Sequence, residues 1–166
     1  MAKFLSKDDF AKIVSNAPLV SIDLCILKSR KLLVGKRKNP PARNYFFVPG
    51  GRILKSELIS NALKRILGEE LGLRIKSNKI QSIKTLGIYE HFYKDNFLNN
   101  KKFDTHYVVL AYLIPFESLM KVNYGNIFEQ HSEYKWLELN SINNKSLRIH
   151  KNTMKYLENP LIKNAL

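Results

Sequence analysis

The sequence predicts a mixed α/β fold in which strands precede and follow one strong helix. Short apolar, β-branched runs lie on both sides of residues 57–71, and that segment repeats its apolar side chains at four-residue spacing. With 166 residues, of which 45% are hydrophobic, the chain has the size of one domain with one core. We therefore expect a single domain over residues 1–166.

The first part of the chain is predicted to form a helix and three strands. Residues 8–16 place apolar side chains at helical spacing, and Pro18 ends that helix. Residues 19–27 and 32–35 are apolar runs around a polar segment, which is the pattern of a β-hairpin. Residues 45–48 predict a short aromatic strand, which ends at a Pro-Gly-Gly turn.

The clearest helix is predicted over residues 57–71, where two rows of apolar side chains lie on one face. Gly72 is a typical stop for such a helix. Beyond it, residues 79–89 and 106–114 predict strands, with a polar loop over residues 94–104. The remaining elements are a turn of helix over residues 116–124, a strand over 134–137 and a final helix over 148–158.

Composition and charge exclude several classes of protein. The 28 Lys and Arg against 14 Asp and Glu give a net charge of +14, which attracts anions such as nucleotides. The basic residues are scattered, without an arginine block or interleaved aromatics, so nucleic acid is not expected as the main partner. The single cysteine excludes a disulfide framework. Without a run of about 18 apolar residues, no membrane partner is expected, and we expect a cytoplasmic protein.

The segment most informative about chemistry is GRILKSELISNALKRILGEELGL, residues 51–73. Its spacing resembles the box of the Nudix family, G-x5-E-x7-R-E-U-x-E-E-x-G-U, in which U is aliphatic. The matching positions are Gly51, Glu57, Arg65, Glu69, Glu70, Gly72 and Leu73. One position departs, because Ile66 stands where the box has a glutamate. The resemblance implies a Nudix α/β/α sandwich with a mixed β-sheet and a catalytic loop-helix.

The chemistry of such a box depends on paired carboxylates. Magnesium prefers hard oxygen ligands and bridges them to phosphates. Side chains four residues apart share one helix face, so positions 66 and 70 would form a carboxylate pair in an ordinary box. Here only Glu70 remains, with Glu69 beside it. We expect fewer metal ions or weaker binding; alternatively, the two glutamates are a solvated acidic pair near a helix end.

The departure at Ile66 points to one subfamily. The chain resembles the GDP-mannose mannosyl hydrolase family, atypical Nudix enzymes that lack the same glutamate. The resemblance covers about residues 4–157, in the segments PLVSIDL, LLVGKRKNPPARNYFFVPGGR, HFYKDNF, THYVVL and EQHSEYKW. It implies a homodimer that hydrolyses GDP-mannose, with GDP-glucose as a second candidate substrate, by attack of water at the anomeric carbon with inversion. One Mg²⁺ per subunit, for which Mn²⁺ can substitute, is implied as cofactor.

The resemblance also assigns site residues. The implied metal ligands are a carbonyl at Gly50, Glu70 and Gln130, with Glu69 as a further candidate. His131 is the implied general base, and histidine can accept a proton near neutral pH.

The implied contacts to substrate come from five residues. Arg37 and Arg52 are expected to face the diphosphate as catalytic and substrate-binding groups, since a guanidinium offers a planar fork to phosphate oxygens. Asp23, His91 and Tyr107 match polar residues of the family's substrate site. Each has a plainer alternative: Arg37 as a surface charge, and His91 and Tyr107 as packing residues. Asp23 lies in an apolar strand and requires a partner.

Two further points stay open at the level of sequence. Arg65 either serves the site or pairs structurally with Glu69, four residues on. The chain could also be an ordinary Nudix pyrophosphohydrolase that acts at phosphorus, or a non-catalytic nucleotide-sugar-binding module.

Overall fold

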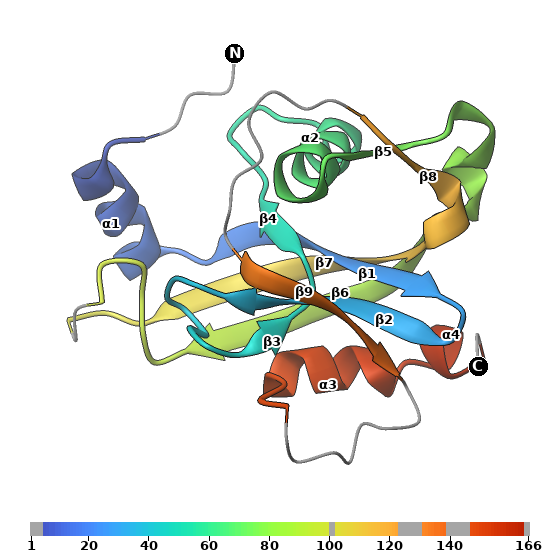
Figure 1. Cartoon of the computed structure of the whole chain (residues 1–166). Coiled ribbons are helices and arrows are strands. Elements are labelled where there is room, and N and C mark those ends of the chain that lie inside the picture. The colour runs from blue at the N-terminus through green and yellow to red at the C-terminus, as the bar shows by residue number, and fades with distance from the viewer. Residues whose placement is uncertain (1–4, 100–101, 123–130, 139–146, 165–166) are drawn as a thin grey trace.

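The computed structural model describes residues 5–99, 102–122, 131–138 and 147–164. Figure 1 shows three layers: α2 (Ile59–Leu71) lies on one face of a central sheet, and α3 (Lys151–Leu157) and α4 (Pro160–Lys163) lie on the other. The helix α1 (Lys7–Asn16) lies at one end of the sheet, against β7. This arrangement confirms the predicted Nudix-type α/β/α sandwich.

In the described part of the chain, the main sheet has seven strands and is mixed. Five of them follow one path, in the order β3 (Phe46–Phe47), β2 (Lys31–Arg37), β1 (Leu19–Lys28), β7 (Thr105–Pro115) and β6 (Lys84–Tyr93). β4 (Gly50–Arg52) also pairs with β1, and β9 (His131–Glu138) pairs with β2. Among the described strands of this sheet, β1 and β7 pair in parallel and the other pairs are antiparallel. Because β1 pairs with β2, β4 and β7, it forms the centre of the sheet.

The backbone angles agree with two predictions, the β-hairpin after β1 and the end of α2 at Gly72. Ser29 and Arg30 both have positive φ, 46° and 64°, between the paired residues Lys28 and Lys31. Positive φ at both central residues matches the right-handed twist of a hairpin. Gly72 has φ 60° and donates its backbone N–H to the last turn of α2. The hairpin and the helix stop are therefore confirmed.

The core consists of two apolar clusters, one on each face of the sheet. On the α2 face, Ile22 and Leu24 of β1 pack with Ile66 and Leu67 of α2. On the opposite face, Cys25 lies in the cluster that includes side chains of α3 and α4. The alternation along β1 separates the two clusters, as expected for a strand buried on both faces.

Two boundaries of the sequence prediction are wrong. The strand predicted over residues 79–89 is present but begins later, because Ser77–Ser82 form a 3₁₀ helix and β6 runs over Lys84–Tyr93. In its described part, the predicted helical turn over residues 116–124 is a 3₁₀ turn over Phe116–Ser118 followed by β8 (Leu119–Lys121), and residues 123–124 lie outside the described residues. β8 pairs with β5 (Leu73–Ile75), so a tertiary contact decides its conformation. Apolar runs this short do not distinguish strand from helix by periodicity.

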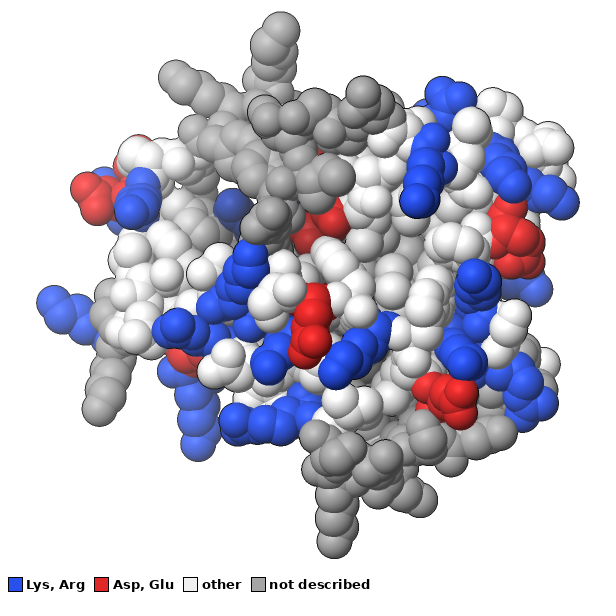
Figure 2. Space-filling model, in the orientation of Figure 1, with Lys and Arg blue, Asp and Glu red and all other residues white. Residues whose placement is uncertain are grey.

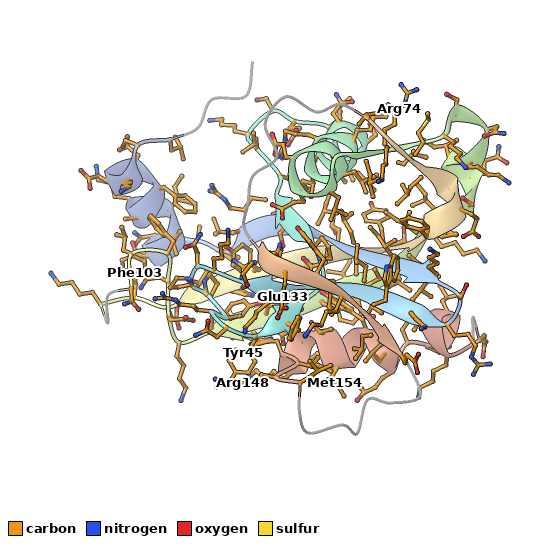
Figure 3. The ribbon with its side chains drawn as sticks, in the orientation of Figure 1. Tyr45, Arg74, Phe103, Glu133, Arg148 and Met154 are labelled. Carbon is orange, nitrogen blue, oxygen red and sulfur yellow. The ribbon has the colours of Figure 1, made fainter. Side chains whose placement is uncertain are left out.

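The surface carries its positive charge in a dispersed form. Figure 2 shows Lys and Arg side chains spread over this face, with acidic side chains between some of them. On β9, Glu133, labelled in Figure 3, forms ion pairs with Lys36 and Lys135 at 3.9 and 3.7 Å. Near α3, the Arg148 guanidinium lies over the Tyr45 ring, 4.9 Å from its centroid, and both residues are labelled in Figure 3. Among the described residues, the structure contains no helix that is long and apolar enough to span a membrane.

Candidate active site

A cavity of about 130 Å³ opens where β1, β4, β6 and β7 meet. Its lining includes six residues singled out in the sequence: Asp23, Arg37, Gly50, Arg52, His91 and Tyr107. A second cavity, of about 350 Å³, shares Arg37, Pro41, Arg52 and Tyr107 with the first and is also lined by Phe10 of α1. The fold therefore brings these residues, which are spread over much of the sequence, into one place.

Asp23 lies on β1 at the floor of the first cavity, opposite Gly50 in the β1–β4 register. A β carbon on Gly50 would lie 2.5 Å from Asp23 Oδ1, so only glycine fits there. The partner that a buried carboxylate needs is Tyr156 of α3, whose hydroxyl donates to Asp23 Oδ2 at 2.6 Å. Burial nevertheless raises the pKa of Asp23 to about 7, against the opposing effects of Tyr156 and Arg37.

Arg37 and Arg52 each line both cavities, and we call this shared region the junction. Arg37 Nε donates to the carbonyl oxygen of Pro41 at 2.8 Å, which orients the guanidinium group. The Arg52 guanidinium lies over the Phe10 ring, 3.7 Å from its centroid. Burial lowers the pKa of Arg52, but an arginine starts so high that it stays cationic. Two fixed guanidinium groups at the junction suit an anion with several oxygens, such as a diphosphate.

Arg65 joins the loop before α2 to the helix itself. It donates to Glu57 Oε1 and Oε2 at 2.7 and 2.9 Å, to Glu69 Oε2 at 2.7 Å and to the Arg52 backbone oxygen at 2.8 Å. Hydrogen bonds to Glu57 and Glu69 raise the pKa of Arg65, and Arg65 lowers that of Glu57. The structural pairing of Arg65 with Glu69 is therefore present. One carboxylate oxygen of Glu69 is occupied by this pairing.

Ile66 is part of the core and contacts the turn that precedes the helix. It is only 1% exposed, and a β carbon on Gly51 would lie 3.2 Å from its Cγ1. The position that holds a glutamate in an ordinary box thus presents an apolar side chain to the glycine turn. Glu70, one helical turn further on, is 3% exposed. It is the acidic side chain that this face of α2 directs inward.

Glu70 and His131 meet at the end of β9. His131 Nδ1 lies 3.4 Å from Glu70 Oε2 and 3.1 Å from the Tyr134 hydroxyl oxygen. That hydroxyl donates its one proton to the Glu70 backbone oxygen at 3.1 Å. The tyrosine oxygen can then only accept from His131, which places the imidazole proton on Nδ1 and leaves a lone pair on Nε2. The geometry thus gives His131 the tautomer that a general base with a free Nε2 requires.

A divalent cation fits this corner by the chemistry of its donors. Glu70 Oε2 and His131 Nε2 are both buried without a hydrogen-bond partner among the described residues. A buried carboxylate oxygen without a partner is costly unless something cationic reaches it. Glu70 would supply a hard oxygen ligand of the kind that Mg²⁺ prefers. The expected carbonyl ligand at Gly50 lines the cavity of about 130 Å³, whose lining includes neither Glu70 nor His131. The third expected ligand, Gln130, lies outside the described residues, among which no group of three or more metal-binding side chains occurs.

Three residues of the site were not identified from the sequence. Tyr134 orients His131, and Tyr156 holds Asp23. Gly35 makes room for the His131 ring, because a β carbon there would lie 2.6 Å from two ring atoms. A glycine inside a strand is a known signal of close approach, so Gly35 could have been found. The two tyrosines carry no such signal.

The comparisons with known proteins agree with this fold. The family model described as NUDIX domain matches residues 17–157 of the chain. The MutT NUDIX hydrolase from Burkholderia pseudomallei superimposes with a TM-score of 0.65 at 22% identity, over 87% of this chain and 99% of that one. At this identity the likeness shows the fold alone.

Two relatives carry descriptive names. The low-salt glycan biosynthesis protein Agl8 of Haloferax volcanii is 38% identical over 131 residues, which are 79% of this chain and 78% of that protein. The ADP-ribose pyrophosphatase of Methanocaldococcus jannaschii is 36% identical over 88 residues, 52% of this chain and 49% of that protein. The chain thus spans about half the length of this second relative. On the family model, the first relative and the fold together, the chain belongs to the Nudix family of hydrolases.

Proposed function

We propose that the chain hydrolyses GDP-mannose, with GDP-glucose as a possible second substrate, to GDP and free sugar. Water attacks the anomeric carbon, and the sugar leaves with inverted configuration. A single domain over residues 1–166 carries the activity, with Mg²⁺ as cofactor and Mn²⁺ as a substitute. A homodimer, which the family resemblance implies, and a cytoplasmic location, which the sequence leads us to expect, belong to the same proposal.

The proposal is carried by two features together: the carboxylate that is missing at Ile66 and the candidate base at His131. The box position that would hold a second carboxylate is filled by a buried isoleucine packed against Gly51. His131, whose Nδ1 lies 3.1 Å from the Tyr134 hydroxyl oxygen, is 3.4 Å from Glu70, one helical turn after Ile66, and its buried Nε2 has no hydrogen-bond partner among the described residues. A base of this kind suits attack on carbon, because the leaving diphosphate needs charge dispersal rather than a set of metal-bound carboxylates.

The two joined cavities support a nucleotide sugar as the ligand. Arg37 and Arg52, at the junction, would bind the diphosphate. Asp23 and His91 line the smaller cavity only, and their polar atoms suit the hydroxyl groups of a sugar. Phe10 lines the larger cavity only, where aromatic surface suits a base. The order sugar, diphosphate, base then follows the order of the two cavities.

Each group of the chain has one task in the proposed reaction. His131 Nε2 takes the proton of a water molecule, whose oxygen forms a bond to the anomeric carbon. The bond from that carbon to the diphosphate oxygen breaks, and its electron pair leaves with GDP. Arg37 and Arg52 spread the charge that develops on the diphosphate. A divalent cation held by Gly50, Glu70 and Gln130 would supply further charge neutralisation there.

The relatives favour a sugar-linked substrate without deciding it. The Haloferax protein is named for glycan biosynthesis and matches most of this chain. The ADP-ribose pyrophosphatase match keeps a second candidate open, hydrolysis of a nucleoside diphosphate derivative at phosphorus. A non-catalytic nucleotide-sugar-binding module is a third candidate, against which the retention of Glu70, Gln130 and His131 together argues.

Product analysis separates these candidates. The chain is incubated with GDP-mannose and Mg²⁺, and the products are resolved by chromatography. We expect GDP and mannose, a loss of about 100-fold or more in His131→Gln, and little change in the control His106→Gln. His106 stacks on Phe92 and lies 3.6 Å from Glu90. GMP and mannose 1-phosphate would establish the pyrophosphohydrolase, and binding without turnover would establish the module.

A further inference from the structure

Tyr156 of α3 is buried behind the smaller cavity and joins two residues of its wall. Its side chain is 0% exposed. Its hydroxyl donates to Asp23 Oδ2 at 2.6 Å, and its oxygen lies 3.2 Å from His91 Nε2. Asp23 and His91 line the cavity and come from β1 and β6, whereas Tyr156 is not part of the lining. The helix α3 thus reaches the site through one phenol group.

When Asp23 is ionised, above about pH 7, counting protons fixes the directions of the hydrogen bonds that join Asp23, Tyr156 and His91. A phenol has one proton, and here it goes to the Asp23 carboxylate. The oxygen of Tyr156 can then only accept, so His91 donates from Nε2 and carries a lone pair on Nδ1. Burial lowers the pKa of His91 to about 3, so the ring is neutral under ordinary conditions.

The result is a pair of acceptors beside the cavity. His91 Nδ1 lies 4.0 Å from Asp23 Oδ2, which is too far for a hydrogen bond between them. Two neighbouring acceptors without a proton between them suit a ligand that brings its own donors. Hydroxyl groups on adjacent carbons of a sugar are such donors.

We propose that Tyr156 is a positioning residue for the sugar end of the substrate, which holds the Asp23 carboxylate and keeps His91 in the tautomer that accepts from sugar hydroxyls. The proposal rests on the proposed function for the identity of its ligand. It assigns Tyr156 no contact with the substrate. It predicts that loss of the Tyr156 hydroxyl group weakens binding of the sugar half of the substrate. Binding of the nucleotide half is predicted to stay unchanged.

A purely structural role is the competing explanation. Tyr156 packs edge-to-face on Tyr89, with ring centroids 4.8 Å apart, within the apolar cluster under the sheet. Phenylalanine retains this packing and removes only the hydroxyl group. Tyr89 supplies a matched control, because its hydroxyl lies 3.0 Å from the Asn159 side-chain nitrogen that donates to it. Tyr89→Phe therefore removes a phenol hydrogen bond to the same C-terminal segment without changing the link to Asp23 and His91.

Two measurements test the proposal in wild type, Tyr156→Phe and Tyr89→Phe. The first compares KM and kcat for GDP-mannose with the Kd of GDP alone. We expect Tyr156→Phe to raise KM about tenfold, roughly the effect of one lost hydrogen bond, while the Kd of GDP and the parameters of Tyr89→Phe stay within about twofold of wild type. An unchanged KM, or an equal loss of affinity for GDP, would overturn the proposal.

The second measurement needs no substrate. Nitrogen-15 NMR of the imidazole groups in the ligand-free protein reports which nitrogen of His91 carries the proton. At pH 8.5, where Asp23 is ionised, we expect the Nε2–H form in wild type and Tyr89→Phe, and a mixture of tautomers in Tyr156→Phe. The same tautomer in all three proteins overturns the proposal. If wild type does not hydrolyse GDP-mannose, the proposed function has failed, and this spectrum still decides whether Tyr156 sets the state of His91.

Discussion

The ring of His131 lies against the backbone of Gly35, so closely that a β carbon on Gly35 would be 2.6 Å from two ring atoms. Gly35 is on β2, where it pairs with Tyr134 of β9, and the same β carbon would lie 2.8 Å from the Tyr134 ring. The absence of a side chain at one position of β2 therefore sets the place of both the candidate base and the tyrosine that orients it.

Gly35→Ala tests whether this close approach positions the base. The methyl group must displace both rings, and a shift of about 1 Å at a catalytic group lowers turnover by about 100-fold. We expect such a loss in kcat with a far-ultraviolet circular dichroism spectrum like that of wild type. In a His131→Gln background the same change should have little further effect on turnover, because residues that act as a unit are not additive. A double variant whose loss of turnover equals the product of the two single losses would refute the positioning argument.

Glu70→Gln tests the metal corner. Mg²⁺ that binds the folded protein raises its stability, by about 2.7 kcal/mol at a concentration of 100 times Kd. We expect wild type to show this rise in thermal unfolding and Glu70→Gln to lose most of it. The matched control is Glu69→Gln, since Glu69 pairs with Arg65. If Glu69→Gln abolishes the response and Glu70→Gln retains it, the assignment of the ligand is wrong.

Ile66→Glu restores the ordinary box pattern at a site built for an apolar side chain. Ile66 is 1% exposed and packs with Ile22 and Leu63. A carboxylate there without a partner lowers the free energy of unfolding by about 3–5 kcal/mol. We expect Mg²⁺ to recover part of this loss, because the new carboxylate shares a helix face with Glu70. Urea unfolding with Mg²⁺ and with a chelator measures both effects, and a variant as stable as wild type without Mg²⁺ would contradict the packing argument.

Asp23 makes the stability of the protein depend on pH with a definite sign. Burial raises its pKa in the folded state from 3.8 to about 7. Between these values the folded state binds the extra proton, so Asp23 contributes stability that is present below about pH 4 and is lost as the pH rises to about 7. Asp23→Asn removes this loss. For each protein we take the free energy of unfolding at pH 8 minus that at pH 5. We expect this difference to be larger in Asp23→Asn than in wild type, by up to about 3 kcal/mol.

Urea unfolding at both pH values measures this difference. The control is Asp8→Asn, at an exposed position in α1, which should follow wild type. If the free energy of unfolding of Asp23→Asn changes between the two pH values as much as that of wild type, the pKa of Asp23 is not raised in the folded state.

The parts of the fold that depend on neighbours in sequence could be predicted, and those that depend on tertiary contacts could not. The Ser29–Arg30 turn, the end of α2 at Gly72 and the pairing of Arg65 with Glu69 are local, and the sequence indicates each of them. Tyr156 is 133 residues away from Asp23, and nothing in its surroundings along the chain distinguishes it from an ordinary core tyrosine. Asp23, Arg37, His91 and Tyr107 were singled out because they lie in segments that resemble one family, and the fold brings them to one cavity. Their contact with substrate stays a prediction.

The central claim is that water attacks carbon, and the position of its oxygen in the products tests this directly. The chain is incubated with GDP-mannose and Mg²⁺ in water enriched in oxygen-18, and both products are analysed by mass spectrometry. The account predicts label on mannose and unlabelled GDP. Label on a phosphate group would contradict it and would move the chain to the Nudix hydrolases that act at phosphorus.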